Sequence, residues 1–296
     1  MVKYLEYKHM EQVTKEILKE VYAKRTEGVR KYDFGLLTVI GGSEFYSGSP
    51  ALSALSAFKA GVDMVRIIAP KRAADIIASF SPNMASFPLD GDRLNLKNLD
   101  VLLSMTESAK EAAQGKTAVV LGGGVGRSEE TKKAIQEYLR EVSVPVVIDA
   151  DAIYAVSKNI ELVSGKNFLF TPHSYEFLIL TGRDIRNLNN EERIKAVEEE
   201  AKRLNTTIVL KGKVDIISNG KDTVLNYTGS PYMTKGGMGD TLAGIAGAVA
   251  ARGIDLFKAG CAAAYINGLA GDLAAKKYKE SVTATDLIDE ITNAIS

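Results

Sequence analysis

The sequence has very little cysteine. Cys261 is the only cysteine in 296 residues, which excludes an internal disulfide and is typical of a protein from a reducing compartment. Because it stands among alanines in a helix-like stretch, we expect Cys261 to pack as a small apolar side chain rather than to act as a nucleophile.

The sequence also lacks an excess of either charge and lacks a long hydrophobic run. Lys plus Arg and Asp plus Glu number 37 each, so the overall field attracts neither nucleic acid nor an anionic membrane, and any phosphate must be held by local groups. The first 25 residues interleave charges, and the most apolar small-residue stretch, Ala243 to Ala251, is too short to cross a bilayer. We predict a cytoplasmic protein without a membrane anchor.

No internal repeat, low-complexity tract or long polar linker interrupts the sequence, and 46% of its residues are apolar. Both observations favour one large domain with a substantial core, which we place over residues 31–296. Residues 1–30 predict an N-terminal helical extension, with the amphipathic helix over Val13–Arg25. We expect it to form a plain surface helix, to cap the domain or to pack on a neighbouring subunit.

From about Leu36 onward, short β-branched runs alternate with amphipathic stretches, a pattern typical of βαβ units and a largely parallel sheet. Most of the runs are apolar throughout, as strands buried on both faces are. The expected strands are Leu36–Ile40, Met64–Ile68, Ala118–Leu121, Val144–Ile148, Asn167–Phe170 and Thr207–Leu210. The expected helices are Ser49–Ala60, Glu129–Glu141, Glu191–Leu204, Gly239–Ala251 and Leu256–Lys277, with Gly61 and Gly253 ending two of them.

The segment Ile216 to Leu225 predicts a hairpin instead of another βαβ unit. Its Asn219-Gly220 pair supplies the positive φ angles of a tight turn, so an antiparallel piece follows the parallel core. The whole pattern therefore predicts an α/β domain with three layers, α/β/α, around a mostly parallel central sheet with a small antiparallel edge.

In such a sheet the strand-to-helix turns gather at one edge, where ligands bind. The first of these turns runs from Gly41 to Pro50. Pro50 suits the first turn of a helix and Ser49 suits its N-cap, while the glycines let a ligand approach the backbone closely. A flexible connection explains the same composition equally well.

A second turn, Gly122 to Gly126, has four glycines in five positions. So many residues without a Cβ favour a loop that presents its backbone amides at a surface. The loop lacks the full G-x-G-x-x-G spacing and the Gly-Lys-Ser/Thr ending, so neither a Rossmann nor a Walker-type phosphate site is supported.

Polar residues follow two further strands. Asp149 comes directly after one strand, and a Thr171-Pro172-His173 turn that leads to Glu176 comes after the next. Acids and a histidine at strand ends are costly in a core and useful at an active edge. Capping or bonding a neighbouring loop explains Asp149 equally well, whereas we favour ligand contact over a structural role for His173.

The strongest pattern is the turn from Lys235 to Asp240, which leads into a helix of small residues. Free amides at a helix N-terminus, with the helix dipole behind them, make an anion site. A carboxylate beside such a site is costly unless it takes a proton or orients a reactive hydroxyl, so we favour a catalytic Asp240 over a helix N-cap. Lys211 ends another strand and can bring an ammonium near a nucleotide, although an exposed lysine at a strand end is common.

The order of these turns resembles that of the ADP/ATP-dependent NAD(P)H-hydrate dehydratases, a branch of the ribokinase-like superfamily. The resemblance rests on GGS…YSGSPALSALSAFKAG, GGGVG, PVVIDADAI, TPHSYEF, IVLKG and KGGMGDTLAG, and it runs from about Lys31 to the C-terminus. It implies a ribokinase-like fold and an enzyme that uses ADP or ATP, with Mg²⁺, to remove water from (S)-NADHX or (S)-NADPHX. The implied products are NADH or NADPH, phosphate and, with ADP as the donor, AMP.

The same resemblance implies roles for particular residues. Asp240 matches the catalytic base, and the amides of Gly237, Met238 and Gly239 match the anion hole. Glu176 matches an acidic position that helps to organise Mg²⁺. The residues that match contacts to the hydrated nicotinamide nucleotide are Ser49, Gly126, His173 and Asp240. Those that match contacts to the adenine nucleotide are Lys211, Gly212, Lys213, Val214, Asp215 and Gly239.

Two positions depart from the family pattern. Proline is more frequent where this chain has Gly123 or Gly124, which changes the stiffness of the loop. Thr or Ser is more frequent where this chain has Met238, which removes a hydroxyl donor and leaves the backbone donors. The epimerase domain often fused to the family has no room in the thirty residues before the match, so we expect a separate epimerase protein. The family's assembly predicts a homotetramer.

The nearest alternative is a small-molecule kinase of the same superfamily, acting on a hydroxymethylpyrimidine, a thiazole or a sugar alcohol. The loop that ends at Pro50 and the turn that contains His173 match the dehydratase pattern better. A nucleotide sensor without turnover is favoured only if Asp240 is missing, and it is present. No isolated basic pocket for a 2′-phosphate stands out, so the sequence predicts no preference between NADHX and NADPHX.

Overall fold

The structure, a computed structural model, describes residues 11–157 and 159–296. Within them one sheet has the strand order β3-β2-β1-β4-β5-β6-β7-β8-β9. The pairs from β3 to β7 are parallel, and β7, β8 and β9 pair antiparallel, which confirms a mostly parallel sheet with an antiparallel edge. The strands are β1 Leu36–Ile40, β2 Met64–Pro70, β3 Ala85–Leu89, β4 Thr117–Leu121, β5 Val146–Ile148, β6 Phe168–Phe170, β7 Thr207–Leu210, β8 Asp215–Ser218 and β9 Thr223–Asn226.

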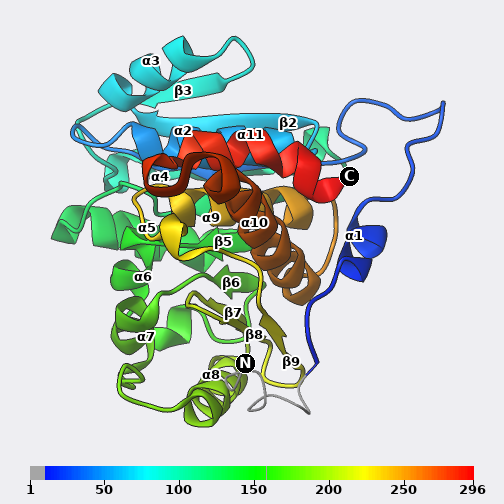
Figure 1. Cartoon of the computed structure of the whole chain (residues 1–296). Helices are drawn as coiled ribbons and strands as arrows, with labels where there is room; N and C mark the ends of the chain where they lie inside the picture. Colours follow the sequence, from blue (N-terminus) through cyan, green and yellow to red (C-terminus); the bar gives the residue numbers. More distant parts are fainter. Residues whose placement is uncertain (1–10, 158) are drawn as a thin grey trace.

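Helices cover both faces of this sheet (Figure 1). Side chains alternate along a strand, so Leu37 and Val39 pack on α1–α3 and α9–α11, while Ile40 packs on α4–α8. This confirms the three-layer arrangement. The helices are α1 Glu16–Val21, α2 Gly48–Lys59, α3 Lys71–Phe80, α4 Leu99–Ala112, α5 Glu129–Glu141, α6 Asp151–Val156, α7 Ser174–Thr181, α8 Asn190–Leu204, α9 Met238–Ala251, α10 Leu256–Tyr278 and α11 Ala284–Ile295, with 3₁₀ turns at Leu96–Asn98, Ile160–Leu162, Pro231–Met233 and Lys279–Ser281.

Small residues bring α9 unusually close to its neighbours. A Cβ built on Gly244 would overlap the carbonyl oxygen of Ser53 and the hydroxyl of Ser56 on α2. A Cβ on Gly247 would likewise overlap the side chains of Val120 and Leu37 in the sheet. Close packing of this kind fixes where α9 begins, at the carboxyl edge of the sheet.

The buried cysteine agrees with the expectation for it. Cys261 lies on α10 with 4% of its surface exposed, and burial raises the pKa of its thiol to about 12. A thiol in this state is almost fully protonated at neutral pH and packs as an apolar side chain.

The N-terminal helix is much shorter than predicted, because the chain before it is extended. The amide of Val13 donates to the carbonyl of Leu225 (2.9 Å), and the amide of Leu225 donates to the carbonyl of Glu11 (3.1 Å). Pairing with the open edge of β9 satisfies strand groups that would otherwise be unpaired. The helix that follows buries Leu18 and Val21 and lies against α10. Residues 1–10 of the expected extension lie outside the described residues.

The hairpin is confirmed at β8 and β9, but its turn differs from the predicted one. Gly220 has a positive φ of 82°, whereas Asn219 does not adopt the left-handed region. The side chain of Asn219 shapes the turn instead, since its oxygen accepts hydrogen bonds from the amides of Lys221 (2.9 Å) and Asp222 (2.7 Å). This is an Asx-type turn rather than a two-residue turn with two positive φ angles.

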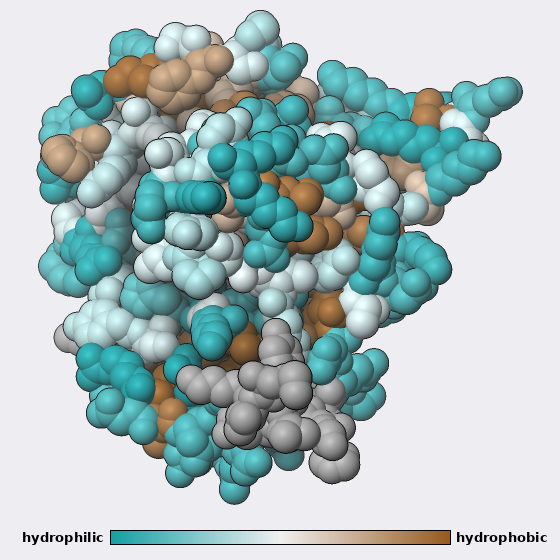
Figure 2. All heavy atoms as spheres, in the orientation of Figure 1, coloured by the Kyte–Doolittle hydropathy of each residue, from teal (hydrophilic) through white to brown (hydrophobic). Residues whose placement is uncertain are grey.

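The surface agrees with the absence of a long hydrophobic run. Figure 2 shows one face of the molecule, on which apolar residues appear as separate spots among hydrophilic ones. Among the helices of residues 11–157 and 159–296, none is both long enough and apolar enough to cross a bilayer.

The contact between α2 and α9 gives a test of the packing. Replacing Gly244 by alanine is expected to lower the free energy of unfolding by about 1–3 kcal/mol, because the added methyl group meets backbone that cannot move aside. Urea unfolding followed by circular dichroism measures this. Gly28→Ala is the matched control, since nothing lies within 4 Å of a Cβ at that position. Equal stability of both variants would contradict the close packing.

Candidate active site

The turns that the sequence analysis selected come together at the carboxyl edge of the sheet. The amide of Gly42 donates to the carbonyl of Gly123 (2.8 Å) and joins the first glycine turn to the second. The amide of Gly126 donates to Oδ2 of Asp151 (3.0 Å) and joins the second turn to the start of α6. These hydrogen bonds therefore gather loops that are far apart in the sequence into one surface.

The N-terminus of α9 opens onto this surface. Gly237 is the residue before the helix and has a φ of 92°, and no side chain caps the first turn. Its position needs glycine for space as well, because a Cβ would lie 2.8 Å from both Ala284 and Leu52. The leading amides of a helix have no partner within it, so Met238 and Gly239 present donors at the positive end of the helix dipole. This geometry can hold an anion.

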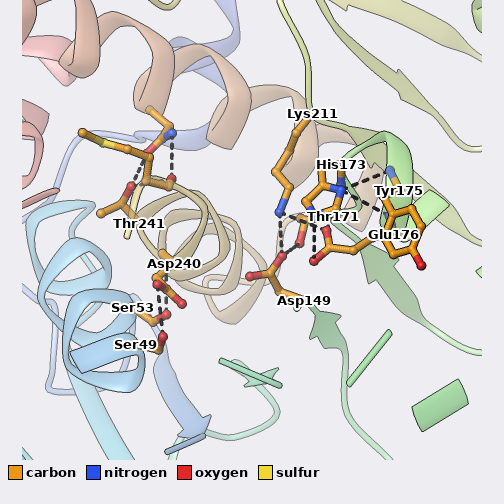
Figure 3. A network of polar contacts seen from close by, with 12 residues as sticks. Ser49, Ser53, Asp149, Thr171, His173, Tyr175, Glu176, Lys211, Asp240 and Thr241 are labelled. Atoms are coloured by element: carbon orange, nitrogen blue, oxygen red, sulfur yellow. Dashed lines mark hydrogen bonds and ion pairs between the residues drawn. The ribbon is translucent and has the colours of Figure 1, made fainter. Parts of the chain in front are cut away.

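Asp240 lies in the first turn of α9 and is therefore not its N-cap. Its Oδ2 accepts a hydrogen bond from the hydroxyl of Ser49 (3.2 Å), and its carbonyl oxygen accepts one from Ser53 (3.0 Å), as Figure 3 shows. The prediction of Ser49 as the N-cap of its helix is wrong, because α2 begins at Gly48 with Ser47 before it. The hydroxyl of Ser49 serves Asp240 instead of the end of its own helix.

A buried ionic cluster stands beside Asp240. Oδ1 of Asp149, a residue with 3% of its surface exposed, accepts from the hydroxyl of Thr171 (2.7 Å) and from Nζ of Lys211 (3.0 Å). The same ammonium lies 3.6 Å from Oε2 of Glu176, whose side chain is also buried. Burial disfavours the charge of Lys211, but Asp149 and then Glu176 outweigh it, so its pKa is raised. The lysine is thus a partly buried, permanently charged group rather than an ordinary exposed one.

The position of Lys211 links this cluster to the helix N-terminus. A Cβ built on Gly239 would lie 3.3 Å from Nζ of Lys211, so the ammonium stands at the first turn of α9. Glycine at this position keeps the approach open. A fixed cation and a helix N-terminus that face the same space favour a phosphate group there.

Asp240 is set up to exchange a proton near neutral pH. Burial and then the charge of Asp149 raise the pKa of its carboxyl to about 7, against the hydrogen bond from Ser49 and the charge of Lys211, which lower it. A group with a pKa near the working pH suits general acid–base chemistry.

His173 has a structural role that the sequence analysis weighed against ligand contact. Its Nδ1 accepts from the amides of Tyr175 (3.1 Å) and Glu176 (3.2 Å), and Oε2 of Glu176 accepts from the amide of His173 (2.9 Å). This reciprocal pair caps α7. The ring remains half exposed, and its Nε2 lies 3.5 Å from Oε1 of Glu176. Ligand contact by His173 stays a prediction.

The carboxylates supply at most part of a metal site. Among residues 11–157 and 159–296 no group of three or more His, Cys, Asp or Glu side chains is arranged to hold a metal ion. Glu176 already binds a backbone amide and faces Lys211. Mg²⁺ at nucleotide sites typically takes one or two carboxylates and completes its shell with phosphates and waters, which is the arrangement that these residues fit.

The loop between β7 and β8 contains the residues expected to contact a nucleotide. Asp215 closes this loop, because Oδ1 accepts from the amide of Gly212 (2.9 Å) and Oδ2 accepts from Asn226 (3.0 Å). Burial raises the pKa of its carboxyl to about 6 against the effect of both hydrogen bonds. Val214 packs on the core and Lys213 is exposed, so the loop offers a nucleotide mainly backbone and the Lys213 side chain.

The sequence analysis assigned no role to Asp151 or Arg127. Asp151 accepts from Nε of Arg127 (2.6 Å) as well as from the Gly126 amide, and the guanidinium carbon of Arg127 lies 3.5 Å above the ring of Tyr154. These contacts fix the end of the second glycine turn. The signal in the sequence is the second acid of Asp149-Ala150-Asp151, three residues before Tyr154 on the same helix.

Comparison with known proteins shows which family the chain belongs to. A profile of the family described as NAD(P)H-hydrate dehydratase matches residues 37–293. The bifunctional NAD(P)H-hydrate repair enzyme Nnr of Pyrobaculum aerophilum is 40% identical over 268 residues, which cover 90% of this chain and 51% of that relative. The ADP-dependent (S)-NAD(P)H-hydrate dehydratase of Nitrosopumilus maritimus is 34% identical over 286 residues, and the match covers 96% of this chain and 96% of that relative. The chain spans about half the length of several of the curated relatives it matches.

Solved structures agree on the fold. A ribokinase-like superfamily protein from Enterococcus faecalis superposes with a TM-score of 0.82 at 24% identity, over 98% of this chain and 97% of the other. The ADP/ATP-dependent NAD(P)H-hydrate dehydratase of Bacillus subtilis, co-crystallised with ATP/Mg²⁺, superposes with a TM-score of 0.77 at 22% identity, over 97% and 98%. The expected ribokinase-like fold is thereby confirmed.

The ionic cluster leads to a prediction about stability. Lys211→Met is expected to lower the free energy of unfolding by about 3 kcal/mol, because Asp149 and Glu176 lose the cation that balances their buried charges. Lys213→Met, at an exposed position in the same loop, controls for the loss of a positive charge. Urea unfolding compares the two variants with the wild type. Equal loss in both would show that the buried carboxylates do not depend on Lys211.

The raised pKa of Asp240 leads to a second prediction. Its carboxyl titrates at about 7 when folded and near 3.8 when unfolded, so the folded state holds the proton more tightly and loses stability as the pH rises between these values. Asp240→Asn removes this loss. The variant should gain stability relative to the wild type between pH 4 and pH 8, by at most about 4 kcal/mol. Urea unfolding across this range measures the difference, and a difference that does not change with pH would contradict the raised pKa.

Proposed function

Because the chain belongs to the NAD(P)H-hydrate dehydratase family, we propose that it removes water from (S)-NADHX or (S)-NADPHX and regenerates NADH or NADPH. The observation that carries the proposal is the position of Asp240. A carboxyl with a pKa of about 7 stands in the first turn of α9, next to a helix N-terminus and the ammonium of Lys211. A proton acceptor and an anion site at one place suit the transfer of a phosphoryl group to a substrate hydroxyl.

The proposed reaction has two steps. Asp240 takes the proton of the ring hydroxyl while that oxygen attacks the terminal phosphoryl group of the donor, which leaves AMP when the donor is ADP. The bond between the ring carbon and the phosphorylated oxygen then breaks. Phosphate departs, a proton leaves the adjacent carbon, and the ring regains its double bond. The sum is loss of water from the hydrate and hydrolysis of the nucleotide.

The residues around Asp240 have defined tasks in this scheme. Ser49 holds one oxygen of Asp240 and orients the other toward the substrate. The amide of Gly237, the amides of Met238 and Gly239 at the start of α9, and the ammonium of Lys211 stabilise negative charge on the phosphoryl group. Mg²⁺ carried with the nucleotide, near Glu176, would supply further positive charge on the phosphates.

We propose the remaining contacts from the family resemblance. Gly126 and His173, together with Ser49 and Asp240, contact the hydrated nucleotide. The donor, ADP or ATP, lies along the loop from Lys211 to Asp215 and against Gly239. Residues 1–30 form an extension to a catalytic domain over 31–296. A homotetrameric assembly, a cytoplasmic location and a separate epimerase that supplies the (S) form complete the proposal.

An assay with synthetic NADHX tests the proposed function. Protein with Mg²⁺ and either ADP or ATP is expected to restore the absorbance of NADH while releasing one phosphate for each NADH formed. Asp240→Asn should lower kcat at least about a hundredfold, since general base catalysis is lost, and should leave nucleotide binding in place. Asp289→Asn, an exposed carboxylate on α11, is the control. A stable phosphorylated product from a hydroxymethylpyrimidine or a thiazole, without turnover of NADHX, would identify a small-molecule kinase instead.

A further inference from the structure

A hollow of about 180 Å³ lies between the first and second glycine turns, and the proposed contacts touch it only at Gly126. Residues 43–46 of the first glycine turn form one wall, and residues 125–128, at the end of the second turn and just after it, form another. Arg93 and Thr131 complete the lining. A site for a whole small molecule typically measures roughly 300–1,000 Å³, so this hollow has room for part of a larger ligand.

Two aromatic rings stand at the edge of the hollow. Phe45 is 78% exposed and Tyr46 is 52% exposed, and their ring centroids are 4.8 Å apart with an angle of 78° between the planes. Exposure of such large aromatic side chains to water does not stabilise the free protein. Exposed rings next to a hollow suit the flat face of a nucleobase, because every type of base can stack on an aromatic side chain.

Two arginines bring positive charge to the same hollow from separate parts of the chain. The side chains of Arg93 and Arg127 are about half exposed, at 44% and 53%. Glu44 holds Arg93, and Asp151 holds Arg127, so each guanidinium is oriented before a ligand arrives. A guanidinium has five N–H donors in a planar fork, so one carboxylate leaves donors on each arginine for a phosphate.

The hollow and the reactive carboxyl share a wall. A Cβ built on Gly124 would lie 2.7 Å from Cβ of Tyr46 and 3.6 Å from Cβ of Ser49. Ser49 in turn binds Asp240. A ligand that reacts at Asp240 and passes over this glycine turn therefore arrives at the two rings and the two arginines. A dinucleotide needs such a second place, because its reacting ring occupies only one end.

We propose that this hollow binds the adenosine half of the dinucleotide substrate. The base lies on Phe45 and Tyr46. Arg127, next to Gly126, holds the diphosphate that joins the two halves, and Arg93, on the far wall, holds the 2′-phosphate that distinguishes NADPHX from NADHX. The inference rests on the proposed function, since it assigns the second half of the same substrate.

Binding of the reaction products tests this assignment without turnover. NADH and NADPH, whose adenosine halves equal those of the substrates, are titrated into protein that holds saturating AMP, and their fluorescence reports binding. Phe45→Ala should raise the Kd of both about tenfold, the usual scale for loss of a stacked base. Phe80→Ala, a 53% exposed ring on α3 outside the hollow, is the matched control and should change neither.

The arginine assignment has its own pair of variants. Arg93→Ala should raise the Kd of NADPH about tenfold more than that of NADH, because only NADPH loses a contact between charged groups. Arg72→Ala is the control, since Arg72 donates to the carbonyl oxygen of Glu44 (2.7 Å) without lining the hollow. Unchanged Kd values in Phe45→Ala and an unchanged NADPH to NADH ratio in Arg93→Ala would overturn the proposal.

Failure of the two proposals can be told apart. If the wild type does not convert NADHX but the variants change Kd as expected, the proposed function fails and the subsite stands. If the wild type converts NADHX and Phe45→Ala keeps the same KM, the subsite fails and the function stands. Thermal unfolding checks that each variant is folded. Phe45→Leu, which keeps an apolar side chain without an aromatic face, replaces Phe45→Ala if that variant is unstable and should weaken binding in the same direction.

Discussion

One shared cation holds the edge of the sheet together. The ammonium of Lys211 lies between the carboxylates of Asp149 and Glu176, and it also reaches the first turn of α9 beside Gly239. Asp149 and Lys211 directly follow β5 and β7, Glu176 lies in the first turn of α7, and Gly239 lies in α9. Two buried carboxylates without this cation would carry uncompensated charge, which costs several kcal/mol. The placement of the residues that follow β5, β6 and β7 therefore depends on the same ammonium group.

The site depends secondly on the close packing of α9. The ionic cluster can act together with Asp240 only if this helix begins next to it. Gly244 and Gly247 let the helix approach α2 and the sheet, and this contact brings Ser49 within reach of Asp240. The hydroxyl and the cation act on that carboxylate in the same direction and lower its pKa. Burial and the charge of Asp149 act more strongly in the opposite direction. The near-neutral pKa is thus a balance between burial and neighbouring acids, which raise it, and Ser49 and Lys211, which lower it.

Much of the fold followed from local patterns, and the errors came from distant partners. The apolar runs at Leu36–Ile40 and Thr207–Leu210 predicted strands with the correct limits, because strands buried on both faces leave a continuous signal. The edge strand β3 gave no such signal, since it is mostly exposed and contains Pro88. Serine is a residue type that favours an N-cap, so Ser49 was predicted as one. Its partner is instead Asp240, 191 residues away, and a single sequence does not reveal that pairing. The sequence predicted the turns that form the site. It did not predict the ion pairs of Lys211 that connect them.

The same electrostatics suit both steps of the proposed reaction. A site that stabilises charge on a phosphoryl group during transfer also stabilises the phosphate that departs from the ring carbon, because both carry negative charge on the same oxygens. The carboxyl of Asp240, with a pKa of about 7, is able to take a proton in the first step and to release it afterwards without leaving its hydrogen bond to Ser49. A kinase fold therefore needs little change in its polar groups to carry out a dehydration. What must change is the substrate, whose phosphorylated carbon has to be one from which phosphate leaves readily.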